Sequence, residues 1–207
     1  MTASGRGIWL ELVIGGSPGE VDAFYAAGRH AAVARAPGGG PVRRYREPGG
    51  PRHLLVGDLD DVDAARSYLR TEVAESHPLD DCPAPQTRAL LACAIPHAVH
   101  GIAREGGEGA LKLVVGMAVN PAHDDEYNRW YDGEHIPILL RHDGWLGARR
   151  YRCESPVAEY LTVYEAAHER ILSAAARADV RSTEWSRDVL GRAFITHTKA
   201  FFAEIRD

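Results

Sequence analysis

The chain contains few cysteines, only three in 207 residues: Cys82, Cys93 and Cys153. They form no Cys-x-x-Cys pair and are odd in number, which argues against the disulfide framework of small secreted domains. No stretch approaches the roughly 20 apolar residues of a membrane-spanning helix. Residues 1–6 also lack the apolar core of a signal peptide. We therefore expect a cytoplasmic protein with no membrane partner.

An excess of positive charge is also absent, since 24 Lys and Arg face 29 Asp and Glu, giving a net charge of -5. Binding to nucleic acid requires a basic face that neutralises phosphates, so we expect no nucleic-acid partner. The hydrophobic fraction of 45% and the charged fraction of 26% are ordinary for a globular protein. The length suits one domain, or two of about 100 residues each.

Several common catalytic motifs are missing as well. Glu134 and His135 are adjacent, whereas the helix of a zinc protease has two His at i and i+4. His97 and His100 lie in a Gly-rich segment without acidic or Cys neighbours at ligand spacing. No nucleophile elbow, P-loop or Gly-x-Gly-x-x-Gly motif opens a helix after a strand. We expect neither a metal nor another cofactor.

The sequence repeats one plan. Strand-like runs at residues 7–14 and 111–119 each precede a helix. The first helix starts at a capping-box pattern in residues 17–20, and the second has acids at residues 124–126, where they complement the helix dipole. Each helix carries an aromatic pair followed by a His, His30 or His135, and then an Arg-Arg-Tyr-Arg run 13 or 14 residues later.

The remaining segments repeat in the same order. The expected strands are residues 52–56, 88–95, 159–164 and 195–205, and the expected second helices are about residues 60–75 and 166–178. This order is βαββαβ twice, the ferredoxin-like unit. We predict an α+β fold of two tandem ferredoxin-like units whose antiparallel sheets pack into an α+β barrel. Residues 1–96 form the first unit, residues 97–109 a Gly-rich linker and residues 110–207 the second unit.

The segment Trp130-Tyr-Asp-Gly-Glu-His-Ile-Pro137, followed by Gly144 and the strand 148–151, resembles the EthD-like and related members of the dimeric α+β barrel superfamily. The resemblance covers roughly residues 111–164 and is faint over the first half, where His30 is kept. It implies a pocket mainly in the second half, with the first half as a barrel partner. The superfamily includes cofactor-free monooxygenases, polyketide cyclases, muconolactone-type isomerases and haem proteins, so the fold does not fix the function.

One face of the helix that contains this segment is aromatic and also carries two ionisable groups. At helical spacing, this face contains Tyr127, Trp130, Tyr131, Glu134, His135 and Ile138. His135 is the candidate catalytic acid or base, because its ordinary pKa lies near neutrality. Glu134 would orient His135 or act as the base itself. The structural alternatives are a buried His135 that donates to a carbonyl, and Glu134 paired with Arg149 or Arg150.

The other candidates would bind the substrate. Trp130, Tyr131 and Tyr127 would flank a flat molecule, and the Tyr131 hydroxyl would bind an oxyanion; the alternative is that these rings are only core. Asn128 and Asp132 are expected to be solvated. Gly133 implies the close approach of a strand or ligand.

Arg150 and Tyr151 are neighbours in a strand, so their side chains point to opposite faces. Arg150 would hold a carboxylate or phenolate, or else form an exposed salt bridge. His30 would reach a corresponding pocket in the first half, or be structural.

The first functional hypothesis is a cofactor-independent enzyme that acts on a small aromatic or polyketide-like substrate by His/Glu acid–base chemistry. His135, assisted by Glu134, would remove a proton, and a cyclase, isomerase or dehydratase reaction would follow; oxygenation is the variant in which the carbanion meets dioxygen. The alternatives are a non-catalytic ligand-binding or oligomerising barrel and a haem-binding barrel with a His as axial ligand. Because one chain contains both units, it can form the whole barrel by itself. A homodimer is a further possible assembly.

Overall fold

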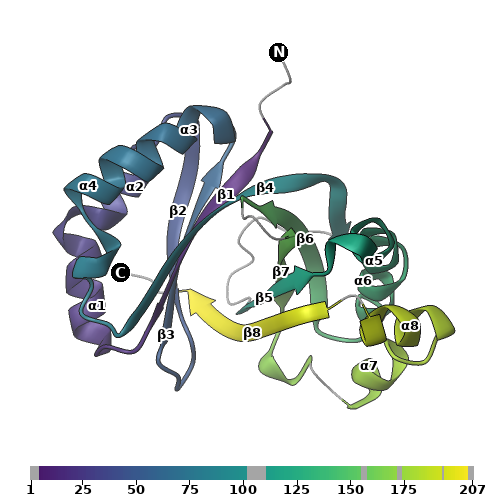
Figure 1. The fold of residues 1–207 in the computed structure, drawn as a ribbon. Helices are drawn as coiled ribbons and strands as arrows, with labels where there is room; N and C mark the ends of the chain where they lie inside the picture. The colour runs from purple at the N-terminus through teal and green to yellow at the C-terminus, as the bar shows by residue number, and fades with distance from the viewer. Residues whose placement is uncertain (1–4, 102–110, 155–157, 172–173, 193, 205–207) are drawn as a thin grey trace. The chain divides into compact units, whose positions relative to one another are not determined.

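The computed structural model describes residues 5–101, 111–154, 158–171, 174–192 and 194–204. The chain divides into two compact units: Met1–Ala94 with Phe202–Asp207, and Ile95–Phe201. Each unit combines antiparallel strands with helices on one face of those strands (Figure 1). The helices cover the strands in layers, as an α+β unit requires.

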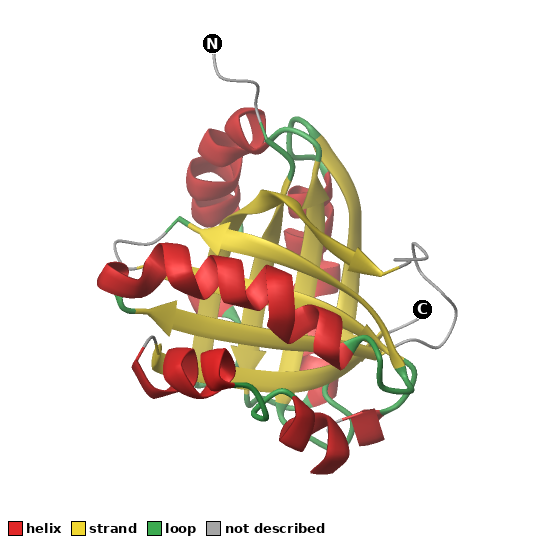
Figure 2. Ribbon diagram, turned by 90° about the vertical axis from the view of Figure 1, so that its right-hand side faces the viewer, coloured by secondary structure: helices red, strands yellow, loops and turns green. Residues whose placement is uncertain are grey.

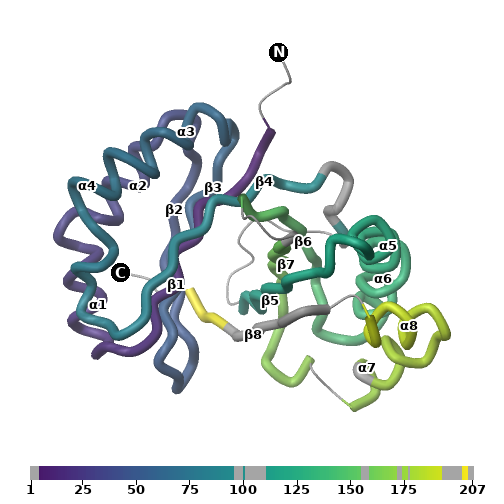
Figure 3. The backbone as a smooth tube through the Cα atoms, in the orientation of Figure 1, coloured from purple at the N-terminus to yellow at the C-terminus, as the bar shows by residue number. Residues whose placement is uncertain are grey.

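The first unit follows the predicted βαββαβ order. Its elements are β1 (Gly7–Ile14), α1 (Pro18–Phe24), α2 (His30–Ala34), β2 (Gly39–Arg46), β3 (Arg52–Leu59), α3 (Val62–Tyr68), α4 (Ala74–Ser76) and the start of β4 (Gln86–Gly101). π-Helical turns at Tyr25–Arg29 and Leu69–Val73 join α1 to α2 and α3 to α4. β1 pairs antiparallel with both β3 and β4, and β2 pairs with β3, which gives the order β4-β1-β3-β2 (Figure 3).

The second unit repeats this order. Its elements are β5 (Leu111–Val119), α5 (Asp124–Trp130), α6 (Ile136–Leu139), β6 (Trp145–Cys153), β7 (Ala158–Ala166), α7 (Ala174–Asp179), α8 (Glu184–Arg192) and the greater part of β8 (Phe194–Glu204), which ends in the first unit. A π-helical turn, Tyr131–His135, joins α5 to α6. β7 pairs antiparallel with β5 and β6. Figure 2 shows strands in yellow and helices in red.

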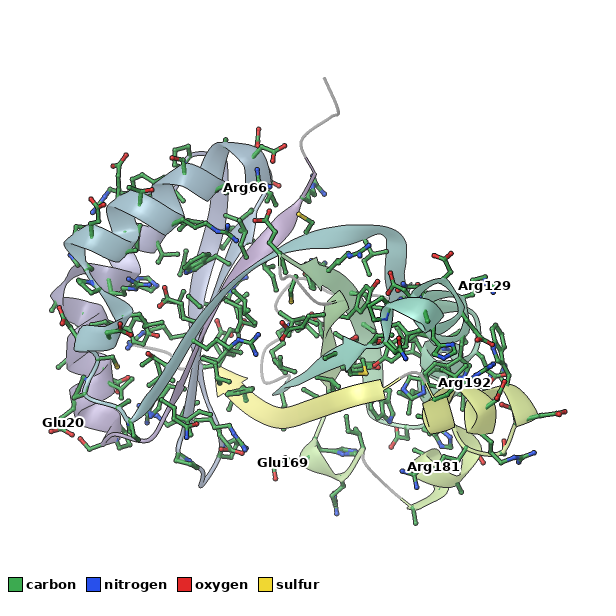
Figure 4. All side chains as sticks on the ribbon, in the orientation of Figure 1. Glu20, Arg66, Arg129, Glu169, Arg181 and Arg192 are labelled. Carbon is green, nitrogen blue, oxygen red and sulfur yellow. The ribbon has the colours of Figure 1, made fainter. Side chains whose placement is uncertain are left out.

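Local chemistry explains where the helices begin. The Ser17 side chain accepts from the Glu20 backbone N–H while the Glu20 carboxylate accepts from the Ser17 backbone, so the predicted capping box is present. Asp61 caps α3 by accepting from the Ala64 backbone N–H at 2.8 Å. Arg192 at the end of α8 donates to Glu126 of α5 at 2.9 Å, so the two helices are joined at the surface (Figure 4).

Each unit has its own hydrophobic core, built where its helices meet its strands. In the first unit Val21, Tyr25 and Leu69 from the helical segments pack with Trp9 and Leu55 from the strands. The core of the second unit is richer in aromatic rings, and the buried members that bear on the site are Tyr127, Trp130, Tyr131, Trp145, Tyr160 and Tyr164. The aromatic helix face therefore packs inward, as predicted.

The order of hydrogen-bonded strands is β1-β3-β2-β8-β5-β7-β6-β4, which closes as an antiparallel barrel. The predicted fold class, an α+β barrel of ferredoxin-like units, is confirmed. In the described parts of the chain, no helix is both long and apolar enough to cross a membrane.

Two predicted boundaries differ from the structure. β4 continues to Gly101, through the first residues of the predicted linker, and residues 102–109 lie outside the described residues. The helix predicted over residues 166–178 is wrong at its start, whereas its predicted end lies within one residue of the end of α7. β7 extends to Ala166, which pairs with Leu111, and the helical residues are those of α7 and α8. Ala-rich composition favours a helix, but strand pairing in the folded unit overrides that preference.

Candidate active site

The candidate site lies in the second unit, around the π-helical turn Tyr131–His135. A π-turn accommodates one more residue than an α-turn, so it changes which side chains face the sheet, and such turns recur at functional sites. Trp130 and Tyr131 are buried where α5 meets the turn. His135 ends the turn; part of the residue reaches the surface, but Nδ1 of its imidazole is buried.

Arg150 of β6 forms the charged centre of the site. Its side chain is fully buried, and its Nη1 donates to Oδ2 of Asp132 at 2.5 Å while Nη2 donates to Oδ1 of Asn128 at 2.8 Å. The guanidinium carbon also lies 4.6 to 5.4 Å from three ring centroids, those of Tyr127, Tyr131 and Tyr160. These hydrogen bonds and cation–π contacts compensate for the burial of the charge. Arg150 is thus held rigidly, although its Nε has no partner among the described residues.

This geometry corrects one expectation. Asn128 and Asp132 were expected to be solvated, yet both hold Arg150. Asp132 also lies 3.1 Å from Nε2 of His100 on β4, so it joins two cationic or potentially cationic groups. The Arg150 side chain faces the helices and is buried. The alternative of an exposed salt bridge therefore does not describe it.

Two phenols meet beside Arg150. The hydroxyl oxygens of Tyr131 and Tyr164 are 2.6 Å apart, and both side chains are almost fully buried. Burial raises the pKa of Tyr131, and it raises the pKa of Tyr164 well above the ordinary value. Both phenols therefore stay protonated at neutral pH and are hydrogen-bond donors.

His135 lies against two rings. Its imidazole centroid is 4.7 Å from that of Trp130 and 4.6 Å from that of Tyr131. Nδ1 of His135 is buried and has no partner among the described residues. Burial, reinforced by the positive charge of Arg150, lowers the pKa of His135 to about 3. The imidazole is consequently neutral at physiological pH.

Glu134 points elsewhere. Its Oε1 accepts hydrogen bonds from Thr183 Oγ1 at 2.6 Å, from Ser186 Oγ at 3.0 Å and from Trp130 Nε1 at 3.2 Å. These contacts tie the π-turn to the start of α8, and they support neither a role in orienting His135 nor the alternative pairing with Arg149 or Arg150. The reason is geometric, because Glu134 and His135 are consecutive residues of a helical turn and so point in different directions.

Several polar residues of the site carried no recognisable signal in the sequence. The Tyr160 hydroxyl donates to Asp124 Oδ1 at 2.5 Å and accepts from Asn128 Nδ2 at 2.9 Å, extending the network from Arg150 to the start of α5. Thr162 is fully buried and is the residue directly opposite Arg150 in the β6–β7 pairing. The i,i+4 spacing of Asn128 and Asp132 was the one available clue.

Other predicted site residues lie apart from this centre. Tyr151 is buried but points to the opposite face of β6 from Arg150. Gly133 has open space on its side-chain side among the described residues, so no strand approaches it closely; the alternative, the approach of a ligand, stays a prediction.

The first unit does not repeat the site. Its π-turn Tyr25–Arg29 places Arg29, not His30, at the position of His135, and this alignment gives the same 14-residue spacing to the Arg-Arg-Tyr-Arg run in both units. Arg29 is buried and donates through Nη2 to Oε1 of Glu11 at 2.5 Å. His30 lies beside a backbone carbonyl, with Nε2 3.4 Å from the oxygen of Val42.

No cluster of three or more His, Cys, Asp or Glu with metal-binding geometry occurs among the residues that the structure describes. The side chains of Asp132 and Asn128, which could otherwise offer oxygen atoms to a metal ion, accept hydrogen bonds from Arg150. The site therefore combines the neutral imidazole of His135 and the buried guanidinium of Arg150, both packed against aromatic rings.

Comparisons with known proteins place the fold. No protein-family model matches the chain, and no curated protein matches it. Among solved structures, an anthrone oxidase-like protein matches with a TM-score of 0.75 at 10% sequence identity, over 99% of this chain and 93% of that chain.

Two further structures extend the comparison. A mutant chlorite dismutase from Candidatus Nitrospira defluvii in complex with cyanide matches with a TM-score of 0.60 at 13% identity, over 99% of this chain and 92% of that chain. A ferredoxin fold protein from Listeria monocytogenes, related to antibiotic biosynthesis monooxygenases, matches with a TM-score of 0.55 at 8% identity, over 99% and 96%. At such identities the likeness establishes the fold, which this chain shares with monooxygenase-related and chlorite dismutase proteins.

Proposed function

We propose that the protein is a cofactor-independent enzyme that removes a proton from a small aromatic substrate. The observation that carries the proposal is the arrangement around Tyr131. The neutral imidazole of His135 lies 4.6 Å from this ring, and the guanidinium of Arg150 lies 4.6 Å from the same ring. Each has a buried nitrogen without a partner among the described residues. Perturbed ionisable groups of this kind are typical of catalytic sites.

His135 and Arg150 have different roles in the first step. His135 accepts the proton from a C–H or O–H bond of the substrate, and the electron pair of that bond moves to a substrate oxygen as an enolate or phenolate. Arg150 and the Tyr131 hydroxyl stabilise this oxyanion. The low pKa keeps His135 free to accept a proton at neutral pH. The anion formed beside it offsets the charge of Arg150, which raises the proton affinity of His135 during the transfer.

Glu134 has a structural role in this proposal. Its carboxylate is occupied by Trp130, Thr183 and Ser186, so it fixes the wall against which a flat substrate would pack. The similarity to an anthrone oxidase-like protein supports an aromatic ketone with an acidic C–H as the substrate class. Cyclisation, isomerisation and dehydration all continue from the same enolate.

A second candidate function is oxygenation, which the similarity to monooxygenase-related proteins favours. In that reaction dioxygen is the co-substrate. The carbanion transfers electrons to dioxygen, one oxygen atom becomes a carbonyl on the former CH₂ carbon, and the other leaves as water. Oxygen uptake that depends on the same substrate distinguishes this outcome from cyclisation or isomerisation.

Exchange of the anthrone methylene hydrogen for deuterium in D₂O, followed by NMR under argon, tests the first step alone. We expect the wild type to accelerate the exchange, and His135→Gln to lose the acceleration by about 10² to 10⁴-fold, the usual contribution of a general base. His142→Gln is the matched control, because His142 pairs with Asp179 and takes no part in the site. Equal exchange by the wild type and His135→Gln would refute the proposal.

A further inference from the structure

A second polar cluster lies in the first unit, on β2 and β3. Arg46 and His53 are directly opposite each other in the β2–β3 pairing. Arg46 faces α1, because its Nη2 donates to Oδ2 of Asp22 at 2.6 Å. Arg44, two residues earlier on the same face of β2, donates to Oδ1 of the same carboxylate at 3.0 Å. Opposite residues in an antiparallel pair have Cβ atoms about 5 Å apart, so the imidazole and the guanidinium are neighbours.

Two nitrogen atoms in this cluster lack partners. His53 is only 3% exposed, and its Nδ1 is buried without a partner among the described residues. Nε of Arg46 is in the same situation. Roughly 90% or more of buried polar groups in proteins are hydrogen-bonded, so two unpartnered nitrogens on neighbouring side chains indicate an external oxygen that serves both.

We propose that Arg46 and His53 form a binding site for a small oxyanion, of which inorganic phosphate is the simplest. One oxygen of the ion would accept from Nε–H of Arg46 and from Nδ1–H of His53. The side chains of Arg46 and Asp22 are each 34% exposed, so the cluster opens to solvent beside them. This site is independent of the proposed function, which lies in the other unit.

The same groups make the binding depend on pH. Burial, followed by the charges of Arg46 and then Arg44, lowers the pKa of His53, and Asp22 opposes the shift. At neutral pH, the neutral form of the imidazole is therefore favoured while the site is empty. A bound anion favours the protonated form, so binding takes up a proton and strengthens as the pH falls.

The test measures the binding of phosphate to the intact chain by calorimetry at pH 6, at constant ionic strength, with chloride and acetate as comparison ions. Arg46→Gln removes the donor, and we expect the affinity for phosphate to fall about tenfold or more, as for loss of a charge-assisted hydrogen bond. Arg43→Gln is the matched control on the same strand. It removes an equal charge, but Arg43 points to the opposite face, where it lies 3.4 Å from Asp58. Its affinity is expected to stay within about twofold of the wild type.

A second readout does not depend on any variant folding well. The imidazole resonances of His53, identified by their absence in His53→Gln or else by triple-resonance assignment of the wild type, should show a higher pKa when phosphate is added. An unchanged pKa of His53 would overturn the proposal. So would chloride binding as tight as that of phosphate, equal losses in Arg46→Gln and Arg43→Gln, or no phosphate binding up to tens of millimolar; the two nitrogens would then be served by water.

Discussion

Oδ2 of Asp132 lies 2.5 Å from Nη1 of Arg150, and this ion pair sets the position of the one fully buried guanidinium in the described part of the second unit. The carboxylate approaches from the π-turn and the guanidinium from β6, so the pair joins helix to sheet at the candidate site. Because the charge of Arg150 also lowers the pKa of His135, Asp132 influences both groups that the proposed reaction uses.

The first prediction concerns this pair. Asp132→Asn keeps the shape but removes the negative charge, leaving the buried cation with one less ionic partner. We expect the free energy of unfolding to fall by about 1–3 kcal/mol, measured by urea denaturation. Asp125→Asn, an exposed acid in the first turn of α5, is the control and is expected to change stability by less than about 0.5 kcal/mol. Equal losses in the two variants would contradict the account.

The second prediction separates Glu134 from catalysis. Glu134→Gln weakens the acceptor for Trp130, Thr183 and Ser186, so stability should fall by about 1–2 kcal/mol. The rate of substrate proton exchange per folded molecule should stay within about threefold of the wild type. A loss of rate as large as that of His135→Gln would show that Glu134 takes part in the chemistry after all.

The third prediction concerns pH. The folded-state pKa of His135 is lowered to about 3, while the unfolded value is near 6.5. Between these values the unfolded chain binds one more proton at this residue than the folded chain does. Stability therefore falls as the pH drops from 6.5 towards 3, with a slope of about 1.4 kcal/mol per pH unit from this group. His135→Gln should show a correspondingly flatter dependence in urea denaturation at pH 7, 6 and 5; equal slopes would contradict the assigned pKa.

The fourth prediction concerns the buried pair of the first unit. Oε1 of Glu11 accepts from Arg29 and, at 2.7 Å, from Nε1 of Trp9, and neither charged side chain is more than 2% exposed. Arg29→Met leaves the carboxylate without its cation and should cost about 3–5 kcal/mol of stability.

A double substitution supplies the matching control. Glu11→Leu with Arg29→Met removes both charges, and we expect it to be more stable than Arg29→Met alone, because no unpaired charge stays buried. Additive losses in the double variant would show that the two side chains are not energetically coupled.

The sequence predicts the fold because its signals are local and repeated. Alternating apolar residues mark the strands, the capping box marks α1, and the repeated Arg-Arg-Tyr-Arg run reveals the second unit. The segment after Ala166 could not be assigned in this way. Its Ala-rich composition favours a helix, whereas the end of β7 is determined by pairing with Leu111, which is distant in the sequence.

The sequence predicted which segment contains the candidate site, but not which side chains of that segment contact one another. Counting at 3.6 residues per turn put Glu134 on the aromatic face, but the π-turn Tyr131–His135 changes the helical phase at this point. The side chain of Glu134 consequently faces Thr183 and Ser186, and Asp132 faces Arg150. His30 was matched with His135 because each is the first His after an aromatic pair, whereas the ends of the two π-turns align Arg29 with His135.

The most direct test of the central claim, a neutral proton acceptor and a buried cation at one aromatic site, is the absorption spectrum of a bound nitrophenol. The spectrum is recorded at a pH below the pKa of the free phenol. We predict that the wild type binds the probe as its phenolate, with the proton on His135 and the oxyanion beside Arg150, and that His135→Gln binds it as the neutral phenol. A neutral phenol bound to the wild type, or the phenolate bound equally by both proteins, would contradict the account.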